Sequence, residues 1–214
     1  MVILIDNGHG KDVKGKHSPK LTGSGLDIWD IYTDEDRFRE WKFNRVVAQD
    51  IVAILKANGY DARLLVTEDE DISLGERVKR VNNLCRRHGA KNVLLVSVHA
   101  NAVGNGSEWM KGQGWECYTT RGKTNSDELA DFLYKRAEAN FKGRKIRKDM
   151  SDGDCDQEAN FYIIAKSNCP AVLTENFFYD NKDDLKYLTS EEGHRAIVMT
   201  HVEGIILYVE NKKK

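Results

Sequence analysis

Short apolar runs of strand length alternate with amphipathic stretches of helical spacing along most of this chain. Six runs have the length and apolar character of buried strands: Val2–Asp6, Tyr60–Val66, Val93–His99, Trp115–Thr119, Phe161–Ala165 and Ala171–Glu175. Helices are predicted over about residues 36–58, after the capping box Ser73–Glu76, after a cap at Ser126, and from the capping box Thr189–Glu192 to Val209. This alternation predicts an α/β fold with a mostly parallel sheet and helices on both faces.

Composition narrows the class of protein. The 33 basic and 34 acidic residues give a net charge of −1, which argues against a nucleic-acid partner. The chain has no run of 18 apolar residues, so we expect no membrane span. No repeat or break in composition divides residues 1–214, so we expect a single domain. The four cysteines are widely spaced and form no C-x-x-C motif, which predicts free thiols.

Polar side chains follow three of the predicted strands. The first strand leads through Gly8 to His9, the strand Val93–Val98 is followed by His99 and Asn101, and the run Ala171–Thr174 is followed by Glu175. Ligands of open α/β sheets bind beyond the carboxyl ends of the strands. The sequence therefore predicts that two imidazoles and one carboxylate meet at the same sheet edge.

A second carboxylate, Glu40, belongs to the buried stripe of the helix predicted over residues 36–58. Val47, Ile51 and Ile54 follow it by 7, 11 and 14 positions. At 100° per residue these positions lie about 20 to 40° from the direction of Glu40. A carboxylate on a buried stripe is costly unless it is paired or bound to a metal. The start of this helix is expected at the same sheet edge as the strand ends.

Two histidines and a glutamate form a three-ligand set that suits a catalytic zinc ion and leaves one position open for water. We therefore predict one Zn²⁺ held by His9, Glu40 and His99, with Glu175 free to act as base and acid. Each residue has a plainer alternative. His9 could lie in a flexible turn and His99 could be a satisfied strand-end histidine. Glu40 could pair with a neighbouring basic residue, and Glu175 could cap a helix.

The remaining histidines are assigned structural or surface roles, because none of them completes a metal-binding pattern: His17, His88, His194 and His201. Asn101 either hydrogen-bonds the substrate or caps a turn. Trp29 and Trp109 could offer aromatic surface to sugar rings or could simply pack, whereas packing is favoured for Trp115.

Five segments in order carry a family resemblance: ILIDNGHG, REWKFNRVVAQDIVAILKANGY, SLGERVKRVN, LLVSVHANA and AVLTENFFYDNKDDLKYLTSEEGHRAIVMTHVEGI. Together they resemble the successive motifs of zinc-dependent N-acetylmuramoyl-L-alanine amidases of the amidase-3 type, from about Val2 to Val209. The resemblance implies a twisted six-stranded, phosphorylase/hydrolase-like sheet and a single catalytic domain over residues 1–214. It also implies that His9, Glu40 and His99 bind zinc and that Glu175 is the catalytic glutamate.

The resemblance implies hydrolysis of the amide between N-acetylmuramic acid and L-alanine in peptidoglycan. The alternatives are a zinc peptidase that cuts within the stem peptide and a non-catalytic cell-wall-binding module. We expect a monomer that acts on the cell wall. No signal peptide is visible, so the expected routes are removal of a leader or release as a phage lysin made in the cytoplasm.

Two features set this chain apart from the family. Where the family favours Glu-Leu-Gly or Glu-Thr-Gly, this chain has Glu175-Asn176-Phe177, so the floor of the cleft is expected to differ. The loop 11–35 and the segment 142–160 look individual to this protein, and we expect them to shape substrate choice.

Overall fold

A six-stranded sheet forms the centre of the molecule in the computed structural model, which describes residues 1–28 and 30–213. The strands lie in the following order: β4 (Asp61–Leu64), β1 (Val2–Asn7), β5 (Val93–Asn101), β8 (Ala171–Phe178), β6 (Glu116–Thr119) and β7 (Gln157–Glu158). The first four strands are mutually parallel, β6 is antiparallel to β8, and β7 is parallel to β6. The predicted mostly parallel six-stranded sheet is therefore confirmed.

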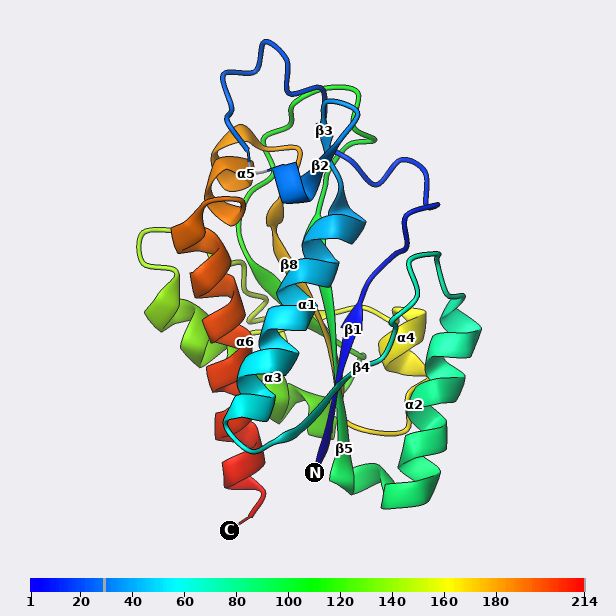
Figure 1. Cartoon of the computed structure of the whole chain (residues 1–214). Helices are drawn as coiled ribbons and strands as arrows, with labels where there is room; N and C mark the ends of the chain where they lie inside the picture. The colour runs from blue at the N-terminus through cyan, green and yellow to red at the C-terminus, as the bar shows by residue number, and fades with distance from the viewer. Residues whose placement is uncertain (29, 214) are drawn as a thin grey trace.

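Helices cover both faces of this sheet (Figure 1). One face is covered by α1 (Glu40–Ala57), α3 (Asn125–Asn140) and α6 (Glu191–Asn211), and the other by α2 (Leu74–His88) and α4 (Tyr162–Ala165). The short helix α5 (Lys182–Leu188) follows β8 at the carboxyl end of the sheet. The remaining short elements are η1 (Asp30–Tyr32), the strand pair β2 (Thr33–Asp34) and β3 (Arg37–Phe38), and η2 (Ala90–Asn92).

The two-residue alternation of the strands divides the core between the two faces. On β1, Ile3 and Ile5 belong to the cluster that packs with α1, α3 and α6. Val2 and Leu4 belong to the second cluster, with α2 and α4. The same alternation places Val93 and Leu95 of β5, and Ala171 and Leu173 of β8, in the second cluster. It ends at the register shift between His99 and Asn101, beyond which Phe177 packs in the first cluster.

Three local predictions are wrong. Phe161–Ala165 is not a strand, because Tyr162–Ala165 forms the helical turn α4, with Phe161 at its N-cap position. Helix α3 is capped by Thr124, whose hydroxyl accepts from Ser126 N, while the Ser126 hydroxyl accepts from Ala171 N. Helix α6 is capped by Ser190. The strand prediction failed because an apolar run of four or five residues does not distinguish a strand from a buried helical turn. The two cap predictions failed because a neighbouring hydroxyl residue can take the capping position instead.

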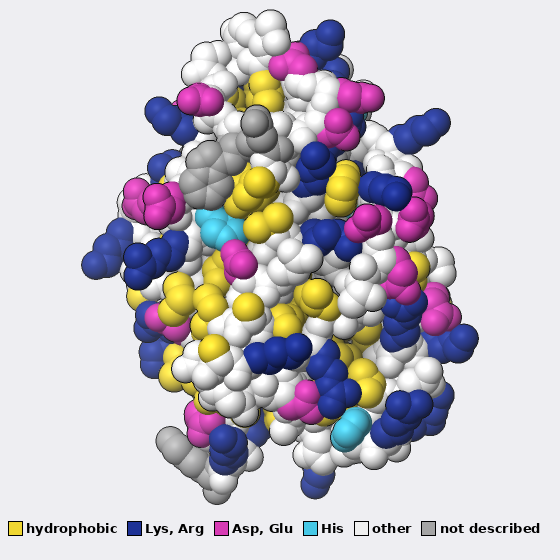
Figure 2. Space-filling model, viewed as in Figure 1, with side chains coloured by type: hydrophobic (Ala, Val, Ile, Leu, Met, Phe, Trp, Pro, Cys, Tyr) yellow, Lys and Arg dark blue, Asp and Glu magenta, His cyan; other side chains and the backbone are white. Residues whose placement is uncertain are grey.

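Charges of both signs are interspersed on the face seen in Figure 2. Within residues 1–28 and 30–213, no helix combines the length and the apolar character needed to cross a bilayer. All four cysteines are free thiols, as predicted; Cys155 is half-buried and the other three are buried.

Candidate active site

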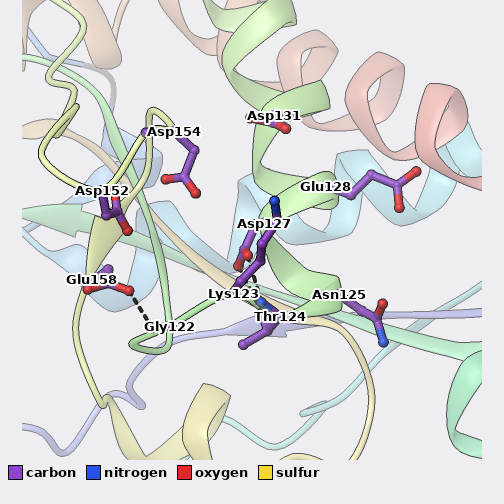
Figure 3. Close-up of a pocket in the computed structure, with 11 residues that line it drawn as sticks. Gly122, Lys123, Thr124, Asn125, Asp127, Glu128, Asp131, Asp152, Asp154 and Glu158 are labelled. Carbon is purple, nitrogen blue, oxygen red and sulfur yellow. Dashed lines mark hydrogen bonds between the residues drawn. The ribbon is translucent and has the colours of Figure 1, made fainter.

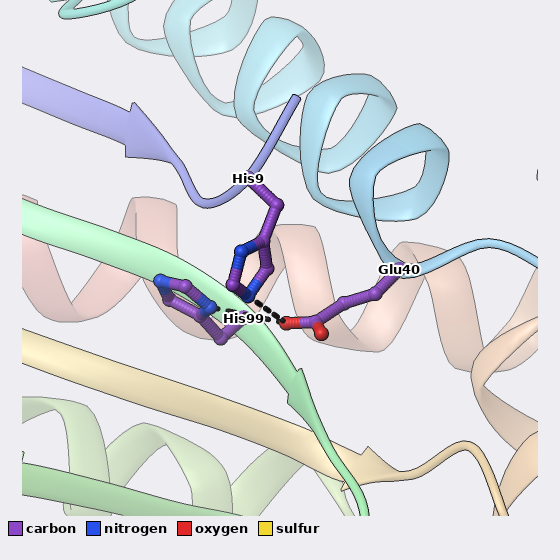
Figure 4. A group of neighbouring side chains, drawn as sticks. All are labelled: His9, Glu40 and His99. Atoms are coloured by element: carbon purple, nitrogen blue, oxygen red, sulfur yellow. Dashed lines mark hydrogen bonds and ion pairs between the residues drawn. The ribbon is translucent and has the colours of Figure 1, made fainter. Parts of the chain in front are cut away.

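The carboxyl edge of the sheet brings together the polar residues that follow β1, β5 and β8. His99 on β5 and Glu175 on β8 are register partners, so their side chains lie side by side on one face of the sheet. His9 reaches the same place from the turn after β1, and Glu40 reaches it from the first turn of α1 (Figure 4). The four predicted residues therefore converge, although consecutive ones lie at least 31 positions apart in the sequence.

The turn after β1 is shaped to bring the two imidazoles together. His9 adopts a left-handed backbone with φ of 66°, which is uncommon for a residue other than glycine. The turn is fixed at Gly8, whose N–H donates to Val98 O at 3.2 Å and whose carbonyl accepts from Asn44 Nδ2 at 2.9 Å. A Cβ on Gly8 would lie only 2.5 Å from His99 Nδ1. Glycine at this position therefore leaves the space that the His99 ring fills.

His9, Glu40 and His99 each offer a ligand atom, and these atoms all lie within 4.8 Å of one another. Glu40 Oε1 lies 3.4 Å from His9 Nε2 and 3.0 Å from His99 Nδ1. The two rings meet edge to face, with centroids 5.0 Å apart. Ligands about 2 Å from one zinc ion are separated by roughly 3 to 4 Å. Both separations from Glu40 Oε1 fall in this range, so the cluster could hold a metal ion such as zinc.

The carboxylate of Glu40 has the properties of a ligand held ready for a cation. Its side chain is buried, and Oε2 has no hydrogen-bond partner. Burial alone would raise the pKa of Glu40, but hydrogen bonds and charge from His9 and His99 outweigh it and hold this pKa well below its ordinary value. Among the described residues, the only other cation paired with Glu40 is Lys16, whose Nζ lies 3.9 Å from Oε2. An ionised, enclosed carboxylate with a free oxygen fits a metal ion.

Glu175 differs from Glu40 because no basic side chain pairs with it among the described residues. Its Oε2 is enclosed and has no hydrogen-bond partner. Burial raises the pKa of Glu175 well above its ordinary value, and the negative charge of Glu40 raises it further. An enclosed carboxyl group that holds its proton more tightly than an exposed one is suited to general acid–base catalysis.

The backbone beyond Glu175 takes a left-handed conformation at one residue of the segment Glu175-Asn176-Phe177. Phe177, which stands where the family favours glycine, has a left-handed φ of 63°. Its neighbour Asn176 is buried and donates from Nδ2 to His99 O at 2.8 Å, while its Oδ1 accepts from Trp115 Nε1 at 3.0 Å. The indole of Trp115 thus packs inside the fold, as predicted, and Asn176 ties β8 to the strand that carries His99.

An open pocket of about 270 Å³ lies over Glu175. Its lining includes Lys16, Asn101 and Tyr179. Asn101 is engaged at both ends of its amide, because Nδ2 donates to Glu116 Oε1 at 2.7 Å and Oδ1 accepts from Ala102 N at 2.8 Å. Asn101 therefore lines the pocket with both ends of its amide held by the protein, and a contact with substrate stays a prediction.

Sequence reasoning missed Lys16 and Glu116. Lys16 lies in the loop 7–35, where no periodicity indicates which side chains face the site. Glu116 offered one signal, since a charged residue inside a predicted strand is unusual unless it has a partner.

Of the two tryptophans considered as aromatic surface, Trp29 lies outside the described residues. Trp109 is half-buried, with Lys182 Nζ 5.5 Å from its ring centroid.

Two of the other histidines have side-chain partners away from this cluster. His201 is fully buried between Ile197 O and the Thr174 hydroxyl. His194 contacts the Tyr32 hydroxyl and Asp50.

A larger hollow, of about 600 Å³, lies between the start of α3 and residues 152–158 (Figure 3). It is lined by carboxylates, among them Asp131 and Asp154, with Lys123 alongside. It contains neither a histidine nor a set of three ligand atoms within reach of one ion among the described residues. The smaller pocket over Glu175 is therefore the better candidate for catalysis.

Comparison with known proteins identifies the family. The family model described as N-acetylmuramoyl-L-alanine amidase matches residues 3–206. The endolysin of Bacillus phage SPP1 is 29% identical, over 100% of this chain and 68% of its own length. The amidase CwlM of Bacillus licheniformis is also 29% identical, over 95% of this chain and 66% of its own length. The chain thus spans about two thirds of the length of these relatives.

Solved structures share the whole fold. An N-acetylmuramoyl-L-alanine amidase from Clostridium difficile 630 superposes with a TM-score of 0.76 at 25% identity, covering 99% of this chain and 97% of that one. The amidase AmiC2 of Nostoc punctiforme gives a TM-score of 0.70 at 26% identity, covering 98% and 97%. The family match, the relatives and the fold agree, and this chain belongs to the N-acetylmuramoyl-L-alanine amidase family.

Proposed function

We propose that this chain is a zinc-dependent amidase that cleaves the bond between N-acetylmuramic acid and L-alanine in peptidoglycan. One observation supports this above the others. The ligand atoms of His9, Glu40 and His99 converge within 4.8 Å, and Glu175 lies on the adjacent strand in register with His99. A module that only bound the cell wall would not need a ligand set next to an unpaired, enclosed carboxyl group.

The residues of this chain divide the chemistry between them. His9, Glu40 and His99 would hold the zinc ion, which supplies a Lewis acid for the attacking water and the scissile carbonyl. The Glu175 carboxylate accepts the proton of the water as it attacks the carbonyl carbon. The same carboxyl group then donates this proton to the alanine nitrogen, so that the C–N bond breaks with a neutral amine as leaving group. The hydrogen bond between Asn176 and His99 O holds the two strands in this arrangement.

The cell wall is the proposed site of action, and the protein is proposed to act there as a monomer. One relative is named an endolysin and another an N-acetylmuramoyl-L-alanine amidase. The whole of residues 1–214 is proposed as one catalytic domain.

Digestion of purified peptidoglycan tests the proposal. The zinc-loaded protein should release new amino groups that belong to L-alanine, as identified by end-group labelling and mass spectrometry. A Glu175→Gln variant should retain zinc but lose at least about 100-fold in rate, which is the lower end of what a general base contributes. Release of a different amino-terminal residue would identify a stem-peptidase instead. Binding to walls without release of any fragment would identify a binding module.

A further inference from the structure

A second buried carboxylate, Glu116, lies beside the catalytic glutamate. Glu116 on β6 is the register partner of Glu175 on β8, and only 1% of its surface is exposed. Residues directly opposite each other on antiparallel strands have Cβ atoms roughly 5 Å apart. Two like charges at that spacing are unfavourable unless a cation compensates for one of them. The partners of Glu116 are therefore informative.

Both oxygens of Glu116 are occupied. Oε1 accepts from Asn101 Nδ2 at 2.7 Å and from the Tyr118 hydroxyl at 3.1 Å. Oε2 accepts from Arg147 Nε at 2.6 Å. Since Asn101 also lines the pocket over Glu175, a chain of two hydrogen bonds links that pocket to Arg147.

The backbone of Arg147 is fixed before any substrate binds. Its N–H donates to Trp115 O at 2.8 Å, and its carbonyl accepts from the Tyr134 hydroxyl at 3.0 Å. Its guanidinium carbon lies 5.5 Å from the centroid of the Phe178 ring. The segment 142–160 thus delivers one arginine, in a defined orientation, to the catalytic edge of the sheet.

Only one nitrogen of the Arg147 guanidinium donates a hydrogen bond to a described residue of the protein. Nε donates to Glu116, while Nη1 and Nη2 have no hydrogen-bond partner among residues 1–28 and 30–213. The side chain is 39% exposed, so this free fork is open to solvent. A planar fork of two N–H groups matches a carboxylate, with which it forms two parallel, charge-assisted hydrogen bonds.

We propose that Arg147, oriented by Glu116, binds a free carboxylate of the peptide part of the substrate. This inference rests on the proposed function, in which the scissile bond lies at Glu175 and the peptide leaves with L-alanine at its amino end. The carboxylate belongs to the residue that follows L-alanine, because only Asn101 and Glu116 separate Arg147 from the pocket. Arg147 is thus a specificity residue, and Glu116 is the positioning residue that neutralises and aims it.

Two matched substrates test the proposal: N-acetylmuramoyl-L-alanyl-D-glutamate with its α-carboxyl group free, and the same compound with that group amidated. In both compounds the γ-carboxyl group is blocked as its methylamide, so that they differ by one carboxylate. The wild type should process the acid roughly tenfold or more better in kcat/KM, mainly through KM, as expected for one charge-assisted pair. Arg147→Gln should bring the ratio of the two kcat/KM values, acid over amide, close to one. Arg147→Lys should restore part of the preference for the acid. Glu116→Gln should lower the ratio while cleavage of the amide continues.

Arg144→Gln is the matched control, because Arg144 lies three residues away and its guanidinium stacks on Tyr187 instead. Its ratio should equal that of the wild type. If Arg147→Gln does not fold because Glu116 loses its cation, the double variant Glu116→Gln/Arg147→Gln removes both charges and should still show a ratio near one. A wild-type preference that survives in the double variant, or a wild type that does not discriminate, overturns the proposal.

Calorimetric binding of both compounds to the Glu175→Gln protein separates this proposal from the proposed function. Tighter binding of the acid that disappears in Glu175→Gln/Arg147→Gln supports the carboxylate site even if the wild type cleaves neither compound. Cleavage of both compounds at equal rates, with equal affinities, supports the amidase and refutes the carboxylate site.

Discussion

Replacing Gly8 with alanine would place a methyl group in the space that the His99 ring occupies. The added Cβ would lie 2.5 Å from Nδ1 and closer still to two other ring atoms. Carbon atoms in normal contact are separated by about 3.5 Å or more. The nearest ring atom, Cε1, would lie 2.0 Å away, so the ring must shift by roughly 1.5 Å, whereas zinc–ligand distances tolerate only about 0.2 Å.

We expect Gly8→Ala to lower zinc affinity by at least about 100-fold. Loss of a residue that only supports a ligand lowers metal affinity by about 10- to 100-fold, and displacement of the ligand itself should lower it more. The fold should survive, since Gly8 is not among the residues with positive φ and alanine can adopt its backbone. Competition with a chelating dye measures the affinity, and far-ultraviolet circular dichroism checks the fold.

Gly75→Ala is the matched control. Gly75 lies in α2, has no atom within 4 Å of its added Cβ and has no positive φ. This variant should bind zinc like the wild type and should be slightly more stable, because alanine favours the helix by up to about 1 kcal/mol. If Gly8→Ala binds zinc with wild-type affinity, the deduced position of the His99 ring as a ligand is wrong.

Three further predictions concern the site and its support. Glu40→Gln should lower zinc affinity by more than about 100-fold while the fold is kept, because it removes the only charged ligand; dye competition measures this, and unchanged affinity would exclude Glu40 as a ligand. Arg77→Met should lower the free energy of unfolding in urea by about 3–5 kcal/mol, because it leaves the buried Asp6 carboxylate without its cation; a loss below about 1 kcal/mol would contradict this. Burial lowers the pKa of His201 to about 4, so the stability linked to its neutral form is present above its unfolded pKa of about 6.5 and is lost as the pH falls towards 4. The stability difference between wild type and His201→Gln should therefore change by roughly 3 kcal/mol between pH 7 and pH 4, and a constant difference would refute it.

The central sheet could be predicted because each of its main strands is a self-contained apolar run. Val2–Asn7 and Val93–Asn101 are buried on both faces, so their sequences are nearly continuous in apolar residues. Glu40 could be placed by helical phase alone, since the amphipathic stripe of α1 fixes its direction. These inferences need only local periodicity.

The rest of the site depends on contacts that leave no periodic signal. Arg147 reaches the catalytic edge because its segment runs beside Trp115, in an isolated bridge between Trp115 and Ile146. The φ of 63° at Phe177 is likewise imposed by tertiary packing, because the sequence there shows a bulky residue where glycine would be expected. Propensity cannot indicate such positions, since it averages over all environments in which a residue occurs.

The place of β8 in the sheet affects how the protein is made. This strand is the last of the six along the chain, yet it lies between β5 and β6, which are synthesised well before it. Until β8 leaves the ribosome, β5 and β6 have no shared neighbour and expose strand edges that can pair with other chains. Glu175, the proposed catalytic residue, therefore arrives only after the other five strands have been made. A nascent chain that stalls before β8 lacks Glu175 and exposes strand edges that favour aggregation.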